Sequence, residues 1–266
     1  MRLSSSNKFC VLSVLTLTAV CVFALRSKEA TSRPPTFSRT MKMNALPAVI
    51  IWAWERPESL RFIDSNRVGV AFLAKTIQMR GDSITTRPRL QTLDLAEGTQ
   101  RVAVVRIESS RTDRPQLTLS QREQVASEIA ELSSLSNLSA VQIDFDATAS
   151  QREFYRQLLL SVRQKLPPNM PLSITALASW CAGDDWLTNL PIDEAVPMLF
   201  RLGAEQHQFQ LRLNSGESFK SPLCQNSAGV STDEVVQPPT VQRLYIFNPN
   251  SWSQSSLTTA MEIYKR

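Results

Sequence analysis

The segment from Val141 to Asp146 constrains the fold of this chain most, because apolar and polar residues alternate along it. In an extended strand, successive side chains point to opposite faces of the sheet. One face is apolar and the other is polar, and the two sets are Val141, Ile143, Phe145 and Gln142, Asp144, Asp146. A polar face that ends in two carboxylates, directly before a helical pattern, is typical of a parallel α/β barrel with functional groups at its carboxyl strand ends.

Strand patterns alternate with helical patterns along the rest of the chain, which predicts a mostly parallel sheet. The predicted strands lie at residues 48–54, 68–78, 102–107, 141–146, 172–180, 194–200 and 244–247. Helical patterns cover residues 119–138 and 150–165. We expect an α/β fold of the (β/α)8-type (TIM) barrel class, since barrels of this length form one domain. Residues 205–239 are polar and loop-like, so the C-terminal part of the barrel is expected to be irregular or incomplete, as a flap or a degenerate βα unit.

The N-terminal segment predicts export from the cytoplasm. Residues 9–25 form an apolar run after two basic residues, which is typical of a signal peptide. An uncleaved membrane anchor is the other interpretation. We therefore divide the chain into a signal peptide or anchor (1–25), a basic polar linker (26–46) and a barrel domain (47–266). The expected location is the periplasm or the inner membrane, with membrane contact through the N-terminal segment.

The net charge of +5 does not indicate a nucleic-acid partner. Residues 1–46 contain seven basic residues and one acidic residue, which leaves 22 basic and 23 acidic residues for the body. A nearly neutral body lacks the electrostatic surface that nucleic-acid binding requires. We therefore expect no nucleic-acid partner.

The composition also argues against a cofactor. The chain has seven glycines without a glycine-rich phosphate loop, and a single histidine. A zinc site or a histidine-dependent triad is therefore not expected. Cys181 and Cys224 are the only cysteines after the N-terminal apolar run. They form a disulfide if the body is exported, or they are two buried free thiols.

Carboxylates cluster at the predicted strand ends, and pairs of carboxylates suit glycoside hydrolysis. One protonates the leaving oxygen while another attacks the sugar or activates water, and neighbouring anions raise one another's pKa. The candidate catalytic residues are Asp144, Asp146, Glu108 and Glu55. Two other interpretations remain open. Asp144 and Asp146 form a structural ion-pair cluster with Arg106 or Arg201, or the two aspartates and Glu108 hold a divalent cation.

Aromatic and basic residues near the same strand ends are candidates for binding a substrate. Tryptophan rings stack on sugar rings, although packing in the core is the other role for each of them. The candidate substrate-binding residues are Trp52, Trp54, Trp180, Trp186, Arg106 and Arg201.

Residues 143–146 and 194–200 resemble the fourth and sixth strands of family 18 chitinase-like barrels. In that family the fourth strand ends in an Asp-x-Asp-x-Glu motif, whose glutamate is the proton donor. Asp144 and Asp146 match this motif, but Thr148 stands at the glutamate position. The resemblance therefore implies a barrel whose acid must come from another strand end. Glu108 is the better candidate for that acid, and Glu55 is the second.

The body also resembles the bacterial family known as domain of unknown function 3142, on four segments: 51–57, 142–147, 172–181 and 247–249. This resemblance implies relatives but no activity, so function must be argued from the site. The sequence predicts a glycoside-hydrolase-like barrel that acts on a bacterial polysaccharide. The other hypothesis is a non-catalytic carbohydrate-binding or envelope scaffold protein that has lost the acid.

Overall fold

The structure, a computed structural model, describes residues 35–203 and 206–266. The expected signal peptide or anchor (1–25) lies outside the described residues. Among the residues that are described, no helix has the length and apolar character needed to cross a membrane.

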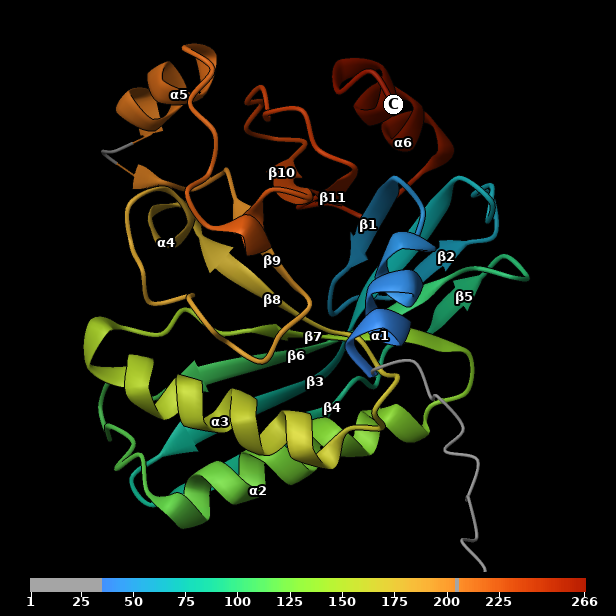
Figure 1. Cartoon of the computed structure of the whole chain (residues 1–266). Coiled ribbons are helices and arrows are strands. Elements are labelled where there is room, and N and C mark those ends of the chain that lie inside the picture. Colours follow the sequence, from blue (N-terminus) through green and yellow to red (C-terminus); the bar gives the residue numbers. More distant parts are fainter. Residues whose placement is uncertain (1–34, 204–205) are drawn as a thin grey trace, which may run out of the picture. The chain divides into compact units, whose positions relative to one another are not determined.

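Eight parallel strands in the described part of the chain close into a barrel (Figure 1). Strand β1 closes the barrel because it pairs with β3 on one side and with β11 on the other. The predicted (β/α)8-type fold is therefore confirmed. In order around the barrel the strands are β1 (Val49–Ala53), β3 (Val68–Arg80), β6 (Arg101–Ser109), β7 (Leu138–Asp144), β8 (Leu172–Leu177), β9 (Glu194–Met198), β10 (Ser227–Ser231) and β11 (Arg243–Phe247).

Additional strands and the helices surround these barrel strands. The second half of β3 pairs with the antiparallel strand β4 (Ser83–Pro88), and β2 (Glu58–Leu60) pairs with β5 (Leu93–Leu95). Helices α2 and α3 lie side by side on the outside of the barrel (Figure 1). The helices are α1 (Pro35–Asn44), α2 (Leu119–Ala130), α3 (Arg152–Lys165), α4 (Ala178–Ala182), α5 (Gln206–Asn214) and α6 (Gln254–Ile263), with short 3-10 helices η1 (Glu131–Ser134), η2 (Ala149–Gln151) and η4 (Pro222–Cys224).

The alternation along β7 has the predicted register. Val141 and Ile143 pack in the apolar layer that also contains the buried faces of α2 and α3. Gln142 faces the barrel interior, where its side-chain oxygen accepts a hydrogen bond from Trp52 Nε1 at 3.2 Å. Asp144 lies on the same inner face and accepts a hydrogen bond from the hydroxyl of Thr175 at 2.8 Å. The apolar side chains of β7 therefore meet the helices, and its polar side chains meet the other strands.

Helix α1 packs against the amino end of the barrel, although residues 26–46 were expected to form a polar linker. Met43 and Leu46 join the apolar cluster inside the barrel, which provides a physical reason for the helix to dock there. Arg39 donates a hydrogen bond to Asp193 Oδ1 at 2.9 Å. The folded domain therefore begins before residue 47.

A buried charged network crosses the barrel interior. The carboxylate of Glu194 is 3% exposed and accepts hydrogen bonds from Arg243 Nη1 at 2.6 Å, Tyr245 Oη at 2.8 Å and Ser173 Oγ at 3.2 Å. Burial and the charge of Glu194 raise the pKa of Tyr245 well above its usual value. Arg243 also donates to the backbone carbonyl of Met43. This network therefore connects three barrel strands to α1.

Gly229 of β10 leaves the space that Trp52 occupies inside the barrel. A Cβ atom at this position would lie 2.8 Å from Met198 Sδ and 3.2 Å from the Trp52 ring. Any larger residue would therefore displace one of these two side chains.

The C-terminal part of the barrel is complete. Residues 205–239 were expected to be loop-like, but they contain α5, η4 and β10. Strand β10 pairs with β11 along its length and with β9 at Gly229. The interpretation as a degenerate βα unit is therefore correct. Its sequence, Ser-Ala-Gly-Val-Ser, has one large apolar residue, which explains why the strand pattern is weak.

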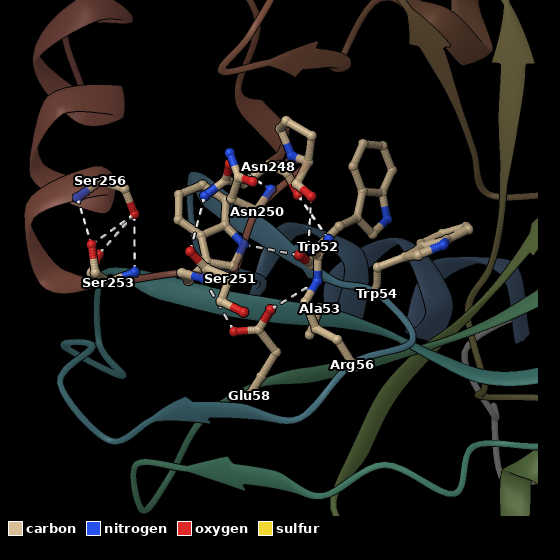
Figure 2. Close-up of polar contacts among 12 residues, drawn as sticks. Trp52, Ala53, Trp54, Arg56, Glu58, Asn248, Asn250, Ser251, Ser253 and Ser256 are labelled. Carbon is tan, nitrogen blue, oxygen red and sulfur yellow. Dashed lines mark hydrogen bonds and ion pairs between the residues drawn. The ribbon is translucent and has the colours of Figure 1, made fainter.

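The seam between the first and last strands is held at its carboxyl side by the loop between β11 and α6 (Figure 2). Trp252 donates from Nε1 to the carbonyl of Trp52 at 2.9 Å and from its backbone N–H to Glu58 Oε2 at 3.1 Å. Arg56 lies 3.3 Å from Glu58 and donates to the carbonyl of Pro249 at 2.6 Å. Burial raises the pKa of Glu58. Buried polar groups thus join the two strands that close the barrel.

Cys181 and Cys224 form a disulfide, with their Cα atoms 5.9 Å apart. The bond connects α4 with η4, so it fixes the irregular C-terminal segment to the chain after β8.

Candidate functional site

A cleft of about 990 Å³ lies at the carboxyl ends of β3, β6 and β7. Its lining includes Gln78 of β3, residues 106–109 of β6, residues 144–146 at the end of β7 and much of the loop 110–117. Parallel barrels place their functional groups at this end, because the loops that follow the strands meet there. The position of the cleft therefore makes it the candidate functional site.

Three carboxylates line this cleft: Glu108, Asp144 and Asp146. Asp144 is half-buried, and its burial raises the pKa of its carboxyl group. The hydrogen bond from Thr175 opposes this rise, whereas the negative charge of Asp146 adds to it. Asp146 is exposed, and its carboxylate makes no hydrogen bond or ion pair with any described residue. The cleft therefore contains one carboxyl group with a raised pKa beside a free carboxylate.

Arg106 connects the carboxylates to an aromatic group at the barrel mouth. Its Nε atom lies 2.9 Å from Glu108 Oε1, and its guanidinium lies 5.2 Å from the centre of the Trp54 ring. Arg106 and Glu108 are both about two-fifths exposed, with side-chain values of 40% and 43%. The charge of Glu108 is thus compensated within the cleft, while that of Asp146 is not.

The aromatic group at the barrel mouth consists of Trp54, Phe200 and Phe247. The ring centres of Phe200 and Phe247 are 5.7 Å apart and the rings are stacked, and Trp54 meets Phe247 edge to face at 6.1 Å. Arg201 lies 5.8 Å from the Phe247 ring centre and pairs with Asp233 at 3.1 Å. Half-buried rings of this kind provide apolar surface for the faces of sugar rings.

Glu55 is separated from the cleft. Its carboxylate is paired with the guanidinium of Arg87 on β4, with Arg87 Nη2 at 2.8 Å from Oε2. Glu55 is not among the residues that line the cleft. Of the four predicted carboxylates, the structure therefore brings together Glu108, Asp144 and Asp146.

Three predicted sugar-binding tryptophans pack in the protein interior instead. Trp52 lies inside the barrel and is 4% exposed. Trp180 and Trp186 are 2% and 9% exposed, and they pack edge to face with ring centres 4.8 Å apart. The predicted strand at 172–180 ends at Leu177 and continues as α4, which directs Trp180 into the layer between barrel and helices. The prediction of sugar stacking is wrong for these three residues.

Thr148 begins the short helix η2 instead of supplying an acid. Its backbone N–H and its hydroxyl both donate to Gln151 Oε1, at 2.9 and 3.0 Å. Thr148 lines the cleft beside Asp146. At the position where the chitinase-like motif has its acid, this chain therefore has a helix-capping residue.

No group of three or more His, Cys, Asp or Glu residues among the described residues has an arrangement that could hold a metal ion. The hypothesis of a divalent cation on Asp144, Asp146 and Glu108 therefore finds no support in this geometry.

Residues 97–198 match the family model described as Domain of unknown function (DUF3142). The predicted resemblance to this family is thus supported over a range that is less than half of the chain. No curated protein matches the chain. Among solved structures, it is similar to the chitinase domain of the spore coat protein CotE from Clostridium difficile, with 15% identity and a TM-score of 0.37. That similarity covers 57% of this chain and 49% of the solved one, so the chain spans about half of that structure's length.

Sequence reasoning missed two residues that line the cleft and two residues of the aromatic group at the barrel mouth. Arg111 and Arg114 lie within the DUF3142 match, and both follow closely on the predicted strand end at Glu108. Phe200 and Phe247 lie outside the match, at the last residues of two predicted strands. In each case the signal was a position at or shortly after the carboxyl end of a predicted strand, where a barrel places its functional side chains.

Proposed function

We propose that this protein binds a polysaccharide in the cleft and hydrolyses a glycosidic bond there. The observation that carries the proposal is the convergence of Glu108, Asp144 and Asp146 on one cleft at the carboxyl ends of barrel strands. The aromatic group of Trp54, Phe200 and Phe247 supports it, because Trp54 is joined to the cleft through Arg106, which also pairs with Glu108. Hydrolysis of a glycosidic bond requires one protonated carboxyl group and one carboxylate.

Asp144 is best suited to hold the proton. Burial of Asp144 and the neighbouring charge of Asp146 raise the pKa of the Asp144 carboxyl group, so it keeps its proton to higher pH than an ordinary aspartate. Asp146 is the exposed neighbour, so it passes this proton on to the leaving oxygen. Glu108 is the second carboxylate, which attacks the sugar or activates water.

This assignment differs from the expectation that Glu108 is the acid. Glu108 already has Arg106 at 2.9 Å, whereas no cation among the described residues pairs with Asp146. An acid must release its proton to the substrate and then recover it, which suits an exposed carboxyl group next to a buried one.

Substitution of each carboxylate tests the proposal. Asp146→Asn and Glu108→Gln should each lower hydrolysis of a responsive polysaccharide by roughly 10²–10⁴-fold while leaving binding intact. Glu55→Gln is the matched control, because Glu55 belongs to the same end of the barrel but is bound to Arg87. Hydrolysis is measured by release of reducing ends, and binding by titration calorimetry. Equal activity of all three variants would contradict the catalytic assignment.

A non-catalytic carbohydrate-binding or scaffold protein is the second candidate, and Thr148 favours it. The residue at the position of the chitinase-like acid is engaged in capping η2. A wild-type protein that binds a polysaccharide, yet never cleaves it over a full pH range, would establish this function in place of hydrolysis.

We further propose that the protein is exported and acts in the periplasm or at the inner membrane, held there through its N-terminal segment. The disulfide between Cys181 and Cys224 supports this location, because such bonds persist in oxidising compartments. Fractionation of cells that express the full chain, with thiol alkylation before lysis, tests both points. Recovery of the reduced protein in the cytoplasm would contradict the proposal.

A further inference from the structure

We propose that the cleft selects an anionic saccharide, and that Arg111 and Arg114 bind its acidic group. This inference rests on the proposed function and specifies its class of substrate. Both arginines line the cleft and both are exposed. Neither guanidinium makes an ion pair or hydrogen bond with any residue in the described part of the chain. Two unpaired cations therefore face the same cleft as the three carboxylates.

The loop that carries the two arginines is held by the hairpin of β3 and β4. Gly81 donates from its backbone to the carbonyl of Asp113 at 3.2 Å, and Gln116 donates to the carbonyl of Gly81 at 2.7 Å. At the start of the loop, Ser110 donates to the carbonyl of Met79 at 3.0 Å. These bonds bracket Arg111 and Arg114, so both guanidinium groups project from an ordered backbone.

The hairpin turn requires glycine at the point of contact. Gly81 has a φ of +48°, and a Cβ atom there would lie 3.3 Å from the carboxylate oxygens of Asp113. Asp113 in turn lies 3.6 Å from Arg80. An added side chain at Gly81 would strain this close approach of hairpin and loop. The glycine therefore helps to hold the loop that carries Arg111 and Arg114.

The acidic and basic residues of the cleft come from different segments of the chain. Asp144 and Asp146 lie at the end of β7, whereas Arg111 and Arg114 lie on the loop after β6. An acidic group beside Asp146 would be repelled, so an anionic sugar is favoured only with its acid toward the arginines. The glycosidic bond of that sugar or its neighbour then lies toward the carboxylates.

Guanidinium groups bind carboxylates and phosphates through paired hydrogen bonds, and they remain charged at every relevant pH. The ligand chemistry is therefore an oxyanion on a sugar, which a uronic acid or a sugar phosphate can supply. A neutral polysaccharide would leave both arginines without a partner.

The experiment measures binding by calorimetry with Asp146→Asn protein, which keeps both arginines and prevents cleavage. The carboxylate probes are hexamers of galacturonic, glucuronic and mannuronic acid, each compared with its methyl ester. The phosphate probe is phosphorylated oligomannose, compared with oligomannose. Arg111→Gln and Arg114→Gln should each weaken binding of an acidic probe roughly tenfold, with no effect on its neutral counterpart.

Arg67→Gln is the matched control, because Arg67 is exposed and lies just before β3, at the amino end of the barrel. It should bind acidic probes like the parent. Equal affinity for acidic and neutral probes, or an equal loss in Arg67→Gln, would overturn the anionic subsite and leave the carboxylate proposal standing. Failure of every saccharide to bind would overturn the proposed function and this inference together. Preference for the uronides or for the phosphorylated probe identifies the source of the oxyanion.

Discussion

Replacing Glu194 by glutamine removes the negative charge from the centre of the barrel while nearly preserving the shape of the side chain. The side chains of Glu194 and Arg243 are 3% and 5% exposed, and their charged atoms lie 2.6 Å apart. Glutamine still offers an oxygen to Tyr245. The Arg243 guanidinium is then left buried with only neutral partners, among them the carbonyl of Met43.

The expected loss in free energy of unfolding is large, because the charged Arg243 guanidinium that remains is buried away from water. Removing one partner of a buried ion pair lowers the free energy of unfolding by roughly 3–5 kcal/mol. In a domain of this size each kcal/mol corresponds to roughly 2–4 °C in Tm, so Glu194→Gln should lower Tm by roughly 6–20 °C. Glu194→Gln combined with Arg243→Met removes both charges, and should be more stable than Glu194→Gln alone.

Urea unfolding followed by tryptophan fluorescence measures these differences. Asp185→Asn is the matched control, because Asp185 pairs with Lys220 at 2.8 Å on the surface, with side chains 77% and 57% exposed. Asp185→Asn should lower the free energy of unfolding by less than about 1 kcal/mol. Two results would contradict a stabilising role of the buried ion pair. One is a decrease in the free energy of unfolding for Glu194→Gln that is no larger than the decrease for Asp185→Asn. The other is a double variant that is as unstable as Glu194→Gln alone.

Three further predictions concern the cleft, the seam and the disulfide. Asp144→Asn should stabilise the protein at pH 7, because the raised pKa of Asp144 means that its ionisation disfavours the folded state. Calorimetric scans should show this gain disappearing as the pH falls below the usual value of 3.8, where the carboxyl group is protonated in both states. Trp252→Phe loses the hydrogen bond to the carbonyl of Trp52, and should cost at least about 1 kcal/mol in urea unfolding. Cys181→Ser opens a loop of 43 residues, and should cost about 4 kcal/mol relative to the oxidised protein, with intact mass before and after reduction as the check on the bond.

The strands rich in large apolar residues could be predicted, because alternation or continuous burial leaves a pattern in the sequence. Strand β7 and the outward position of Val141 and Ile143 follow from that pattern alone. Strand β10 could not be predicted in this way, since it consists mostly of small residues and pairs through its backbone. Gly229 serves there as space for Trp52, and no local property of the chain indicates such a role.

Helix α1 illustrates a different limit. Its residues were interpreted as part of a basic linker, because the segment from 33 to 44 contains three basic residues and two prolines, and few of its residues are apolar. The helix is stabilised by what it contacts: Met43 enters the interior cluster, and Arg39 reaches Asp193, which is 154 residues away in the sequence. Tertiary packing of this kind outweighs weak local propensity.

The sequence by itself determined that Asp144 lies on the inner face of its strand and that Asp146 follows at the end, because side chains alternate every residue. Only the tertiary structure decided which other carboxylate joins them. Strand β6 pairs directly with β7, so Glu108 lines the same cleft. Strand β1 is separated from β7 by β3 and β6, and the β3–β4 hairpin brings Arg87 to Glu55. Strand order and barrel closure depend on contacts between distant segments, which the alternation along a single strand does not encode.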